Sequence, residues 1–214
     1  MKNAVRTARY LAWFTIIYNV VEGIVSIVFG VADESISLLG FGLDSFIEVF
    51  SAVIILWRIG LEFTHAEDKA SLERERMATR GIGMLLILLT GVVLANSGLR
   101  LYNHVSPDTA MPGIVISLAS LSFMFYLYFA KIRVAAALNS KALKSDAMCS
   151  LACIWLSVVL LAGSGIYYLT RVWWVDSAAA VIIAFLILRE GIENVKSSLK
   201  PEFDGCCSCG GKCD

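Results

Sequence analysis

The chain has 214 residues, of which 58% are hydrophobic and only 17% are charged, and its mean hydropathy is +0.74. Soluble domains average about 45–50% apolar and about 25% charged residues, so this composition excludes an ordinary soluble protein and predicts an integral membrane protein surrounded by the lipid bilayer. The formal net charge is +0 and no basic patch with interleaved aromatic residues occurs, so nucleic acid is not an expected partner.

Six apolar segments are long enough to cross a hydrocarbon core of about 30 Å. They lie near residues 9–31, 36–57, 82–102, 112–131, 146–169 and 173–189. The basic N-terminal residues lead into the first segment without a small-residue cleavage site, so we interpret it as a retained span and not a signal peptide. The predicted fold class is an all-α integral membrane protein with six transmembrane helices. A transmembrane domain over residues 1–195 is followed by a Cys-rich tail over residues 196–214.

Positive charge is distributed asymmetrically among the connections. All but two of the 18 Lys and Arg residues lie in the N-terminal segment, the second and fourth connections (Lys131 among them) or the C-terminal part from Arg189 onward. The two exceptions are Arg100 and Arg171. Because cytoplasmic loops are enriched in Lys and Arg, both termini are predicted to be cytoplasmic. The expected location is a bacterial inner membrane.

The first two spans each carry a pair of polar residues on one helical face. Asn19 and Glu22 are three residues apart, and Asp44 and Glu48 are four apart. One carboxylate at membrane depth costs about 2.5–3.5 kcal/mol on insertion scales, so intramembrane acids usually have a function. Two stacked acids also repel each other, so we interpret Asp44 and Glu48 as a pair that binds a metal ion or shares a proton. Glu22 is a candidate proton carrier, helix–helix hydrogen-bond partner or ligand.

Two glycines precede Asp44 in the second span. Gly40 and Gly42 either allow close helix packing or leave room for an ion path, and the sequence alone does not separate these interpretations.

The fifth span repeats the spacing of the acidic pair with thiols. Cys149 and Cys153 are four residues apart, and Asp146 lies three residues before Cys149. Two helices that each offer such a pair can surround one ion with four ligands, which suits zinc, and thiolates extend the preference to softer ions. Alternatively, a buried cysteine such as Cys149 is only a small hydrophobic residue. Asp146, like Asn19 and Glu22, is a candidate for proton or ion relay.

The tail concentrates four further thiols near the C-terminus, at Cys206, Cys207, Cys209 and Cys213. In a reducing cytoplasm these residues are expected to remain thiols that can capture a soft metal ion. A redox or incidental tail is the alternative interpretation.

Three segments and the six-span plan resemble the cation diffusion facilitator (cation efflux) family. The segments are Leu-Leu-Gly-Phe-Gly-Leu-Asp-Ser-Phe-Ile-Glu at 38–48, Lys-Ser-Asp-Ala at 144–147 and Val-Asp-Ser-Ala-Ala-Ala at 175–180. The likeness covers roughly residues 8–195 and is closest to short members without the cytoplasmic C-terminal domain. It implies proton-coupled export of divalent transition metals, chiefly zinc, and the expected assembly is a homodimer.

The resemblance also implies a ligand set. The family's central site takes two acids from the second span and a His-x-x-x-Asp pair from the fifth. Asp44 and Glu48 match the first pair, whereas the positions of the second pair fall on Cys149 and Cys153. This departure predicts selectivity for softer ions such as cadmium. If the site is not kept, Asp146 or Glu22 replaces a ligand, or the metal differs.

The predicted function is therefore a divalent transition-metal transporter, specifically a metal/proton antiporter that exports zinc or cadmium from the cytoplasm. It is not expected to be an enzyme or to need a cofactor beyond the transported ion. One alternative is an iron or manganese transporter in which Cys149 and Cys153 are bystanders. The other is a membrane metal-sensing or chaperoning scaffold that binds metal through its tail without transporting it. Such a scaffold should tolerate loss of Asp44, whereas a transporter should not.

Overall fold

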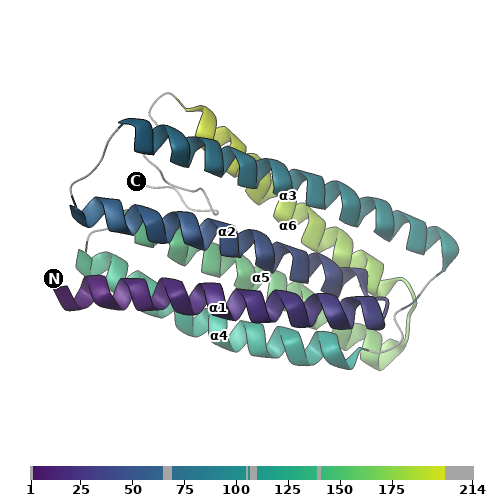
Figure 1. The fold of residues 1–214 in the computed structure, drawn as a ribbon. Helices are drawn as coiled ribbons and strands as arrows, with labels where there is room; N and C mark the ends of the chain where they lie inside the picture. Colours follow the sequence, from purple (N-terminus) through teal and green to yellow (C-terminus); the bar gives the residue numbers. More distant parts are fainter. Residues whose placement is uncertain (1, 65–68, 105, 107–109, 139–140, 201–214) are drawn as a thin grey trace.

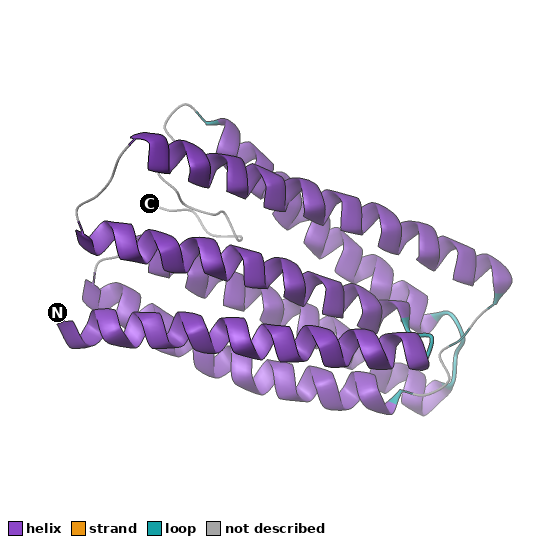
Figure 2. Cartoon of the chain, in the orientation of Figure 1, coloured by secondary structure: helices purple, strands orange, loops and turns teal. Residues whose placement is uncertain are grey.

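The computed structural model describes residues 2–64, 69–104, 106, 110–138 and 141–200, and these residues form helices without strands (Figures 1 and 2). The helices are α1 (Lys2–Ala32), α2 (Ile36–Thr64), α3 (Lys69–Asn103), α4 (Met111–Leu138), α5 (Lys141–Thr170) and α6 (Val175–Leu199). The predicted all-α fold class is confirmed, and the chain is a multi-pass integral membrane protein. Within the described residues, α1 to α5 each contain a stretch long and apolar enough to cross a membrane. The shorter α6 carries Asp176, Arg189 and Glu190 along its apolar stretch.

The helices extend beyond the predicted apolar spans. Helix α3 begins at Lys69, well before residue 82, and α4 continues to Leu138 instead of ending near residue 131. The Ala-rich segment after Lys131 favours helix, so α4 gains about two turns. The assignment of Lys131 to a connection was therefore wrong. Its side chain is fully buried, and its Nζ donates a hydrogen bond to Ser150 Oγ on α5 at 3.0 Å.

The six helices form two groups. Helices α1, α2, α4 and α5 pack mainly through the pairs α1–α2 and α4–α5, which meet through α1–α4 and α2–α5 contacts. Helix α3 packs mainly on α6, and this pair lies along α2 on the side away from α1 (Figure 1). The first residues of α1 and the last residues of α6 lie at the same end of the bundle (Figure 1).

Glycines allow the closest approaches between helices. A Cβ atom added to Gly42 of α2 would lie 3.0 Å from the Ile27 backbone nitrogen of α1, and one added to Gly40 would lie 3.3 Å from Val93 Cγ2 of α3. Neighbouring helices thus fill the space beside both residues, which favours close packing over an ion path. Gly83 of α3 plays the same part against α6, since its Cβ would lie 2.8 Å from the carbonyl oxygen of Gly191.

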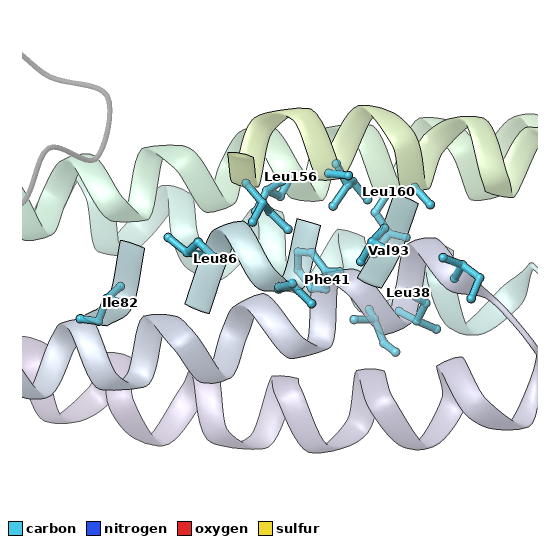
Figure 3. Packing of buried hydrophobic residues seen from close by; sticks show 14 residues of the cluster. Leu38, Phe41, Ile82, Leu86, Val93, Leu156 and Leu160 are labelled. Atoms are coloured by element: carbon cyan, nitrogen blue, oxygen red, sulfur yellow. The ribbon is translucent and has the colours of Figure 1, made fainter. Parts of the chain in front are cut away.

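The main hydrophobic core joins the two groups of helices. Figure 3 shows side chains of α2, α3 and α5 meeting in its centre, including the fully buried Phe41, Leu86 and Leu160. Other large apolar side chains point outward, for example Leu88 at 66% and Leu169 at 81% exposure. An apolar exterior around a packed interior is the arrangement expected of helices in lipid.

Candidate functional site

The structure places the acidic pair of α2 inside the bundle. Asp44 is 3% exposed and Glu48, one turn further along the helix, is partly buried. The glycines that precede Asp44 bring α1 and α3 close to this segment of α2. Both carboxylates therefore lie among helices, and side chains of α1 and α5 contact that of Glu48.

Three helices meet at the carboxylate of Glu48. Asn19 Nδ2 of α1 donates a hydrogen bond to Glu48 Oε2 at 3.1 Å. The thiol of Cys153 on α5 is in close hydrogen-bonding contact with Glu48 Oε1. Cys153 is only 2% exposed, so it faces the interior and not the lipid. A carboxylate, a thiol and a carboxamide thus lie together in an apolar region.

Glu22 lies in a neighbouring polar cluster on the next turn of α1. Its Oε1 accepts a hydrogen bond from the Tyr18 hydroxyl at 2.9 Å, and its Oε2 accepts one from Ser45 Oγ of α2 at 3.2 Å. Glu22 is 5% exposed. Because Ser45 follows Asp44 directly, this cluster connects α1 to the turn of α2 that carries the acidic pair.

Glu190 of α6 is a further acid at this place, and sequence analysis missed it. It lies close enough to Asp44 and Glu48 to act on both electrostatically. The residue follows the apolar segment 173–189 and stands next to Arg189, so it was not recognised as part of the interior. A signal was present, since Asp176 and Glu190 lie about four turns apart and hence close to one helical face. Asp176 contacts the start of α2, so that face is directed at α2.

The structure brings the predicted ligands together only in part. Glu48 and Cys153 are in contact, and Asp44 lies one turn away on α2. In the part of the chain that the structure describes, no group of three or more His, Cys, Asp or Glu side chains is arranged to hold a metal ion. Asp146 and Cys149 belong to α5, but their side chains are not among those that the structure describes. The tail residues Cys206, Cys207, Cys209 and Cys213 also lie outside the described residues.

Asp176 lies at the start of α6, at the end of the bundle opposite to the first residues of α1 (Figure 1). Its Oδ2 accepts a hydrogen bond from the Ile36 backbone amide at 2.9 Å, and its Oδ1 accepts hydrogen bonds from the hydroxyls of Ser35 and Ser37. These donors all come from the start of α2, where backbone N–H groups lack partners within the helix. Asp176 therefore caps α2 from a different helix. A small pocket at this end is lined by polar residues that include Asp33, Ser164 and Asp176.

Known proteins share sequence features with this chain over most of its length. The family model described as "Cation efflux transmembrane domain" matches residues 12–200. The chain is 26% identical over 195 residues to transmembrane protein 163 of Xenopus laevis, covering 90% of this chain and 67% of that protein. It is 22% identical over 173 residues to an uncharacterized transporter of Synechocystis, covering 79% of this chain and 56% of that protein. One relative is from an animal and the other from a bacterium, so a bacterial inner membrane stays a prediction.

Proposed function

The chain belongs to the cation efflux family of membrane cation transporters, and we propose that it is a metal/proton antiporter that exports zinc or cadmium from the cytoplasm. The observation that carries the choice of cargo is the contact between the buried Cys153 thiol and the Glu48 carboxylate. A soft thiol sulfur and a hard carboxylate oxygen thus lie in contact, which supports a cargo that accepts both kinds of ligand.

The chemistry of this contact couples cation binding to proton release. Thiols and carboxylic acids bind a metal ion only after losing their protons. A cation that enters between Glu48 and Cys153 therefore takes the place of the proton that they share, and that proton leaves toward the cytoplasm. Asp44 lies one turn away and adds negative charge for the cation. Zinc accepts both ligand types, and thiolate favours thiophilic ions such as cadmium over iron or manganese.

The return half of the cycle reverses this exchange. After the helices rearrange to open the site outward, a proton from the outer side takes the place of the cation between Glu48 and Cys153, and the cation leaves. Glu22 is placed to carry protons because it lies between the hydroxyls of Tyr18 and Ser45, next to the acidic pair. The proposal includes a homodimer as the functional assembly.

Uptake of metal into proteoliposomes with an imposed pH gradient tests this function. Zinc, cadmium, iron and manganese are compared for the wild type, for Asp44→Asn and for Glu48→Gln. We expect gradient-driven uptake of zinc and cadmium by the wild type and none by either variant. Glu34→Gln is the matched control, because Glu34 is an exposed acid paired with Arg100 at the end of α1 and should not affect uptake.

Two results would contradict the proposal. Gradient-driven uptake of iron or manganese, with zinc and cadmium excluded, would show that the cargo is wrong. A wild-type protein that transports no metal, with all metal binding lost when the four tail cysteines are replaced by Ser, would instead support the scaffold.

A further inference from the structure

The carboxamide of Asn19 is buried at the candidate site, and one of its two polar atoms has no hydrogen-bond partner among the described residues. Asn19 is 1% exposed, and its Nδ2 donates to Glu48 Oε2 at 3.1 Å. Its Oδ1 is also buried, and no hydrogen-bond partner for this atom occurs in the described part of the chain. A buried carbonyl oxygen without a donor is unfavourable, so a residue kept in this state calls for a physical reason.

The location of Oδ1 in the metal-free protein follows from the hydrogen bond of Nδ2 in the same carboxamide. Oδ1 and Nδ2 belong to one planar carboxamide, and Nδ2 is held against the Glu48 carboxylate. Oδ1 therefore lies beside the same carboxylate whose other oxygen contacts the Cys153 thiol. Rotation of the carboxamide about its last torsion exchanges the two ends, because terminal torsions of this kind are broad and roughly two-fold.

We propose that Asn19 is a ligand of the transported cation, binding it through Oδ1 together with the Glu48 carboxylate and the Cys153 thiolate. This inference rests on the proposed transport function and adds a ligand from α1 to the expected ones from α2 and α5. In the metal-free protein, Asn19 donates its N–H to Glu48. When a cation occupies the site, the carboxamide presents its oxygen instead.

A neutral third ligand suits the charge of the site. Glu48 and the Cys153 thiolate already balance a divalent cation, and Asp44 and Glu190 lie nearby. An amide oxygen completes the coordination without a further proton to lose when the cation binds or to regain when it leaves.

The competing explanation is that Asn19 only positions Glu48 through its N–H donor. Two substitutions separate these roles. Asn19→Leu removes both the donor and the oxygen while keeping a side chain of similar size. Asn19→Asp keeps an oxygen in the same place but, when ionised, has no hydrogen to donate to Glu48. A ligand role predicts opposite behaviour of these variants, whereas a positioning role predicts loss in both.

The test measures zinc binding to the full-length protein in detergent by titration calorimetry, with the four tail cysteines replaced by Ser so that only the membrane site reports. We expect Asn19→Leu to weaken zinc binding at least about tenfold, the smaller loss seen when even an outer-sphere partner of a metal is removed. Asn19→Asp should bind zinc as tightly as the parent or more tightly. With Co²⁺ as the probe, Asn19→Leu should change the ligand-field absorption spectrum.

The matched control is Asn194→Leu. Asn194 is also a buried amide, 3% exposed, whose Oδ1 has no partner among the described residues, but it lies on the final turns of α6. It should leave zinc affinity unchanged. If Asn19→Asp loses as much affinity as Asn19→Leu, or if Asn194→Leu loses as much, Asn19 is not a ligand.

The same proteins in proteoliposomes separate this inference from the proposed function. Wild-type uptake combined with normal binding by both Asn19 variants overturns the ligand role alone. Zinc binding that is lost in Asn19→Leu and kept in Asn19→Asp, in a protein that transports no metal, supports the ligand role and overturns transport.

Discussion

The carboxylate of Asp176 at the start of α6 accepts a hydrogen bond from the backbone amide of Ile36 at the start of α2, at 2.9 Å. Two hydroxyls of the same turn also donate to this carboxylate. One side chain thus provides the cap of α2 and joins α6 to the helix that carries the acidic pair. Its role is structural, although Asp176 is a buried acid in a membrane protein.

Replacing Asp176 by Ala should therefore destabilise the fold. The free energy of unfolding is expected to fall by about 1–3 kcal/mol, because the amide and hydroxyl donors lose a buried acceptor. Thermal unfolding of the intact protein in detergent measures this change. Arg189→Ala is the control. It breaks an exposed ion pair with Glu193 on the same helix and should cost only about 0.3–0.5 kcal/mol. Equal losses in the two variants would contradict the capping role.

Substitution of Cys153 should alter selectivity more than overall activity. In Cys153→Ser an oxygen replaces the buried sulfur that contacts Glu48, and hydroxyl oxygen is a poorer ligand for soft ions. The ratio of cadmium to zinc uptake in proteoliposomes is expected to fall by about tenfold, which corresponds to about 1.4 kcal/mol of differential binding. Replacing the four tail cysteines by Ser is the comparison. An unchanged ratio in Cys153→Ser would mean that the thiol is not a ligand.

Removing the charge of Glu190 should weaken cation binding without abolishing transport. Its carboxylate acts electrostatically on Asp44 and Glu48, so Glu190→Gln makes the site less attractive to a divalent cation. We expect KM for zinc to rise about 3- to 10-fold, the size of a charge effect at moderate distance in a partly screened environment. Glu193→Gln, which removes an acid paired with Arg189, should change KM less. The opposite ranking would show that Glu190 does not contribute to the site.

Close packing of α3 on α6 should depend on Gly83. In Gly83→Ala the added methyl group would meet the Gly191 carbonyl oxygen at 2.8 Å, so the helices must separate. Overpacking of this kind costs about 1–3 kcal/mol. Gly91→Ala on the same helix is the matched control, since no atom beyond its chain neighbours and the adjacent backbone of α3 lies within 4 Å of its added Cβ. A lower melting temperature in detergent is expected for the first variant and no loss for the second.

The sequence predicted the helices more completely than their ends. Apolar length is sufficient to place six spans, but helices continue past the apolar core wherever the next residues favour helix, as they do after Lys131. Hydropathy cannot detect this continuation, because a lysine at the end of a span has the same hydropathy value whether its side chain faces water or Ser150. For the same reason, Lys131 was assigned to a connection although it is fully buried.

The candidate site was predictable where two residues share a helical face. The four-residue spacing identified Asp44 and Glu48 and pointed to Cys153, which the structure places in contact with Glu48. Glu190 was missed because it follows the apolar segment and stands next to Arg189, and only the packing of α6 on α2 brings it near the acidic pair. Relations between helices of this kind are not encoded in the periodicity of one segment.

The Glu48–Cys153 contact crosses the boundary between two tightly joined helix pairs. Helices α1 and α2 interlock at Gly42, whereas α4 and α5 are joined by the Ser157–Ser120 hydrogen bond at 2.8 Å. A cation held between Glu48 and Cys153 would therefore be a reversible crosslink between the two pairs. Zinc should then raise the melting temperature of the protein with the tail cysteines replaced, and Cys153→Ser should remove the increase. The transported cation would thus itself stabilise the contact between the α1–α2 and α4–α5 pairs, and its release would weaken that contact.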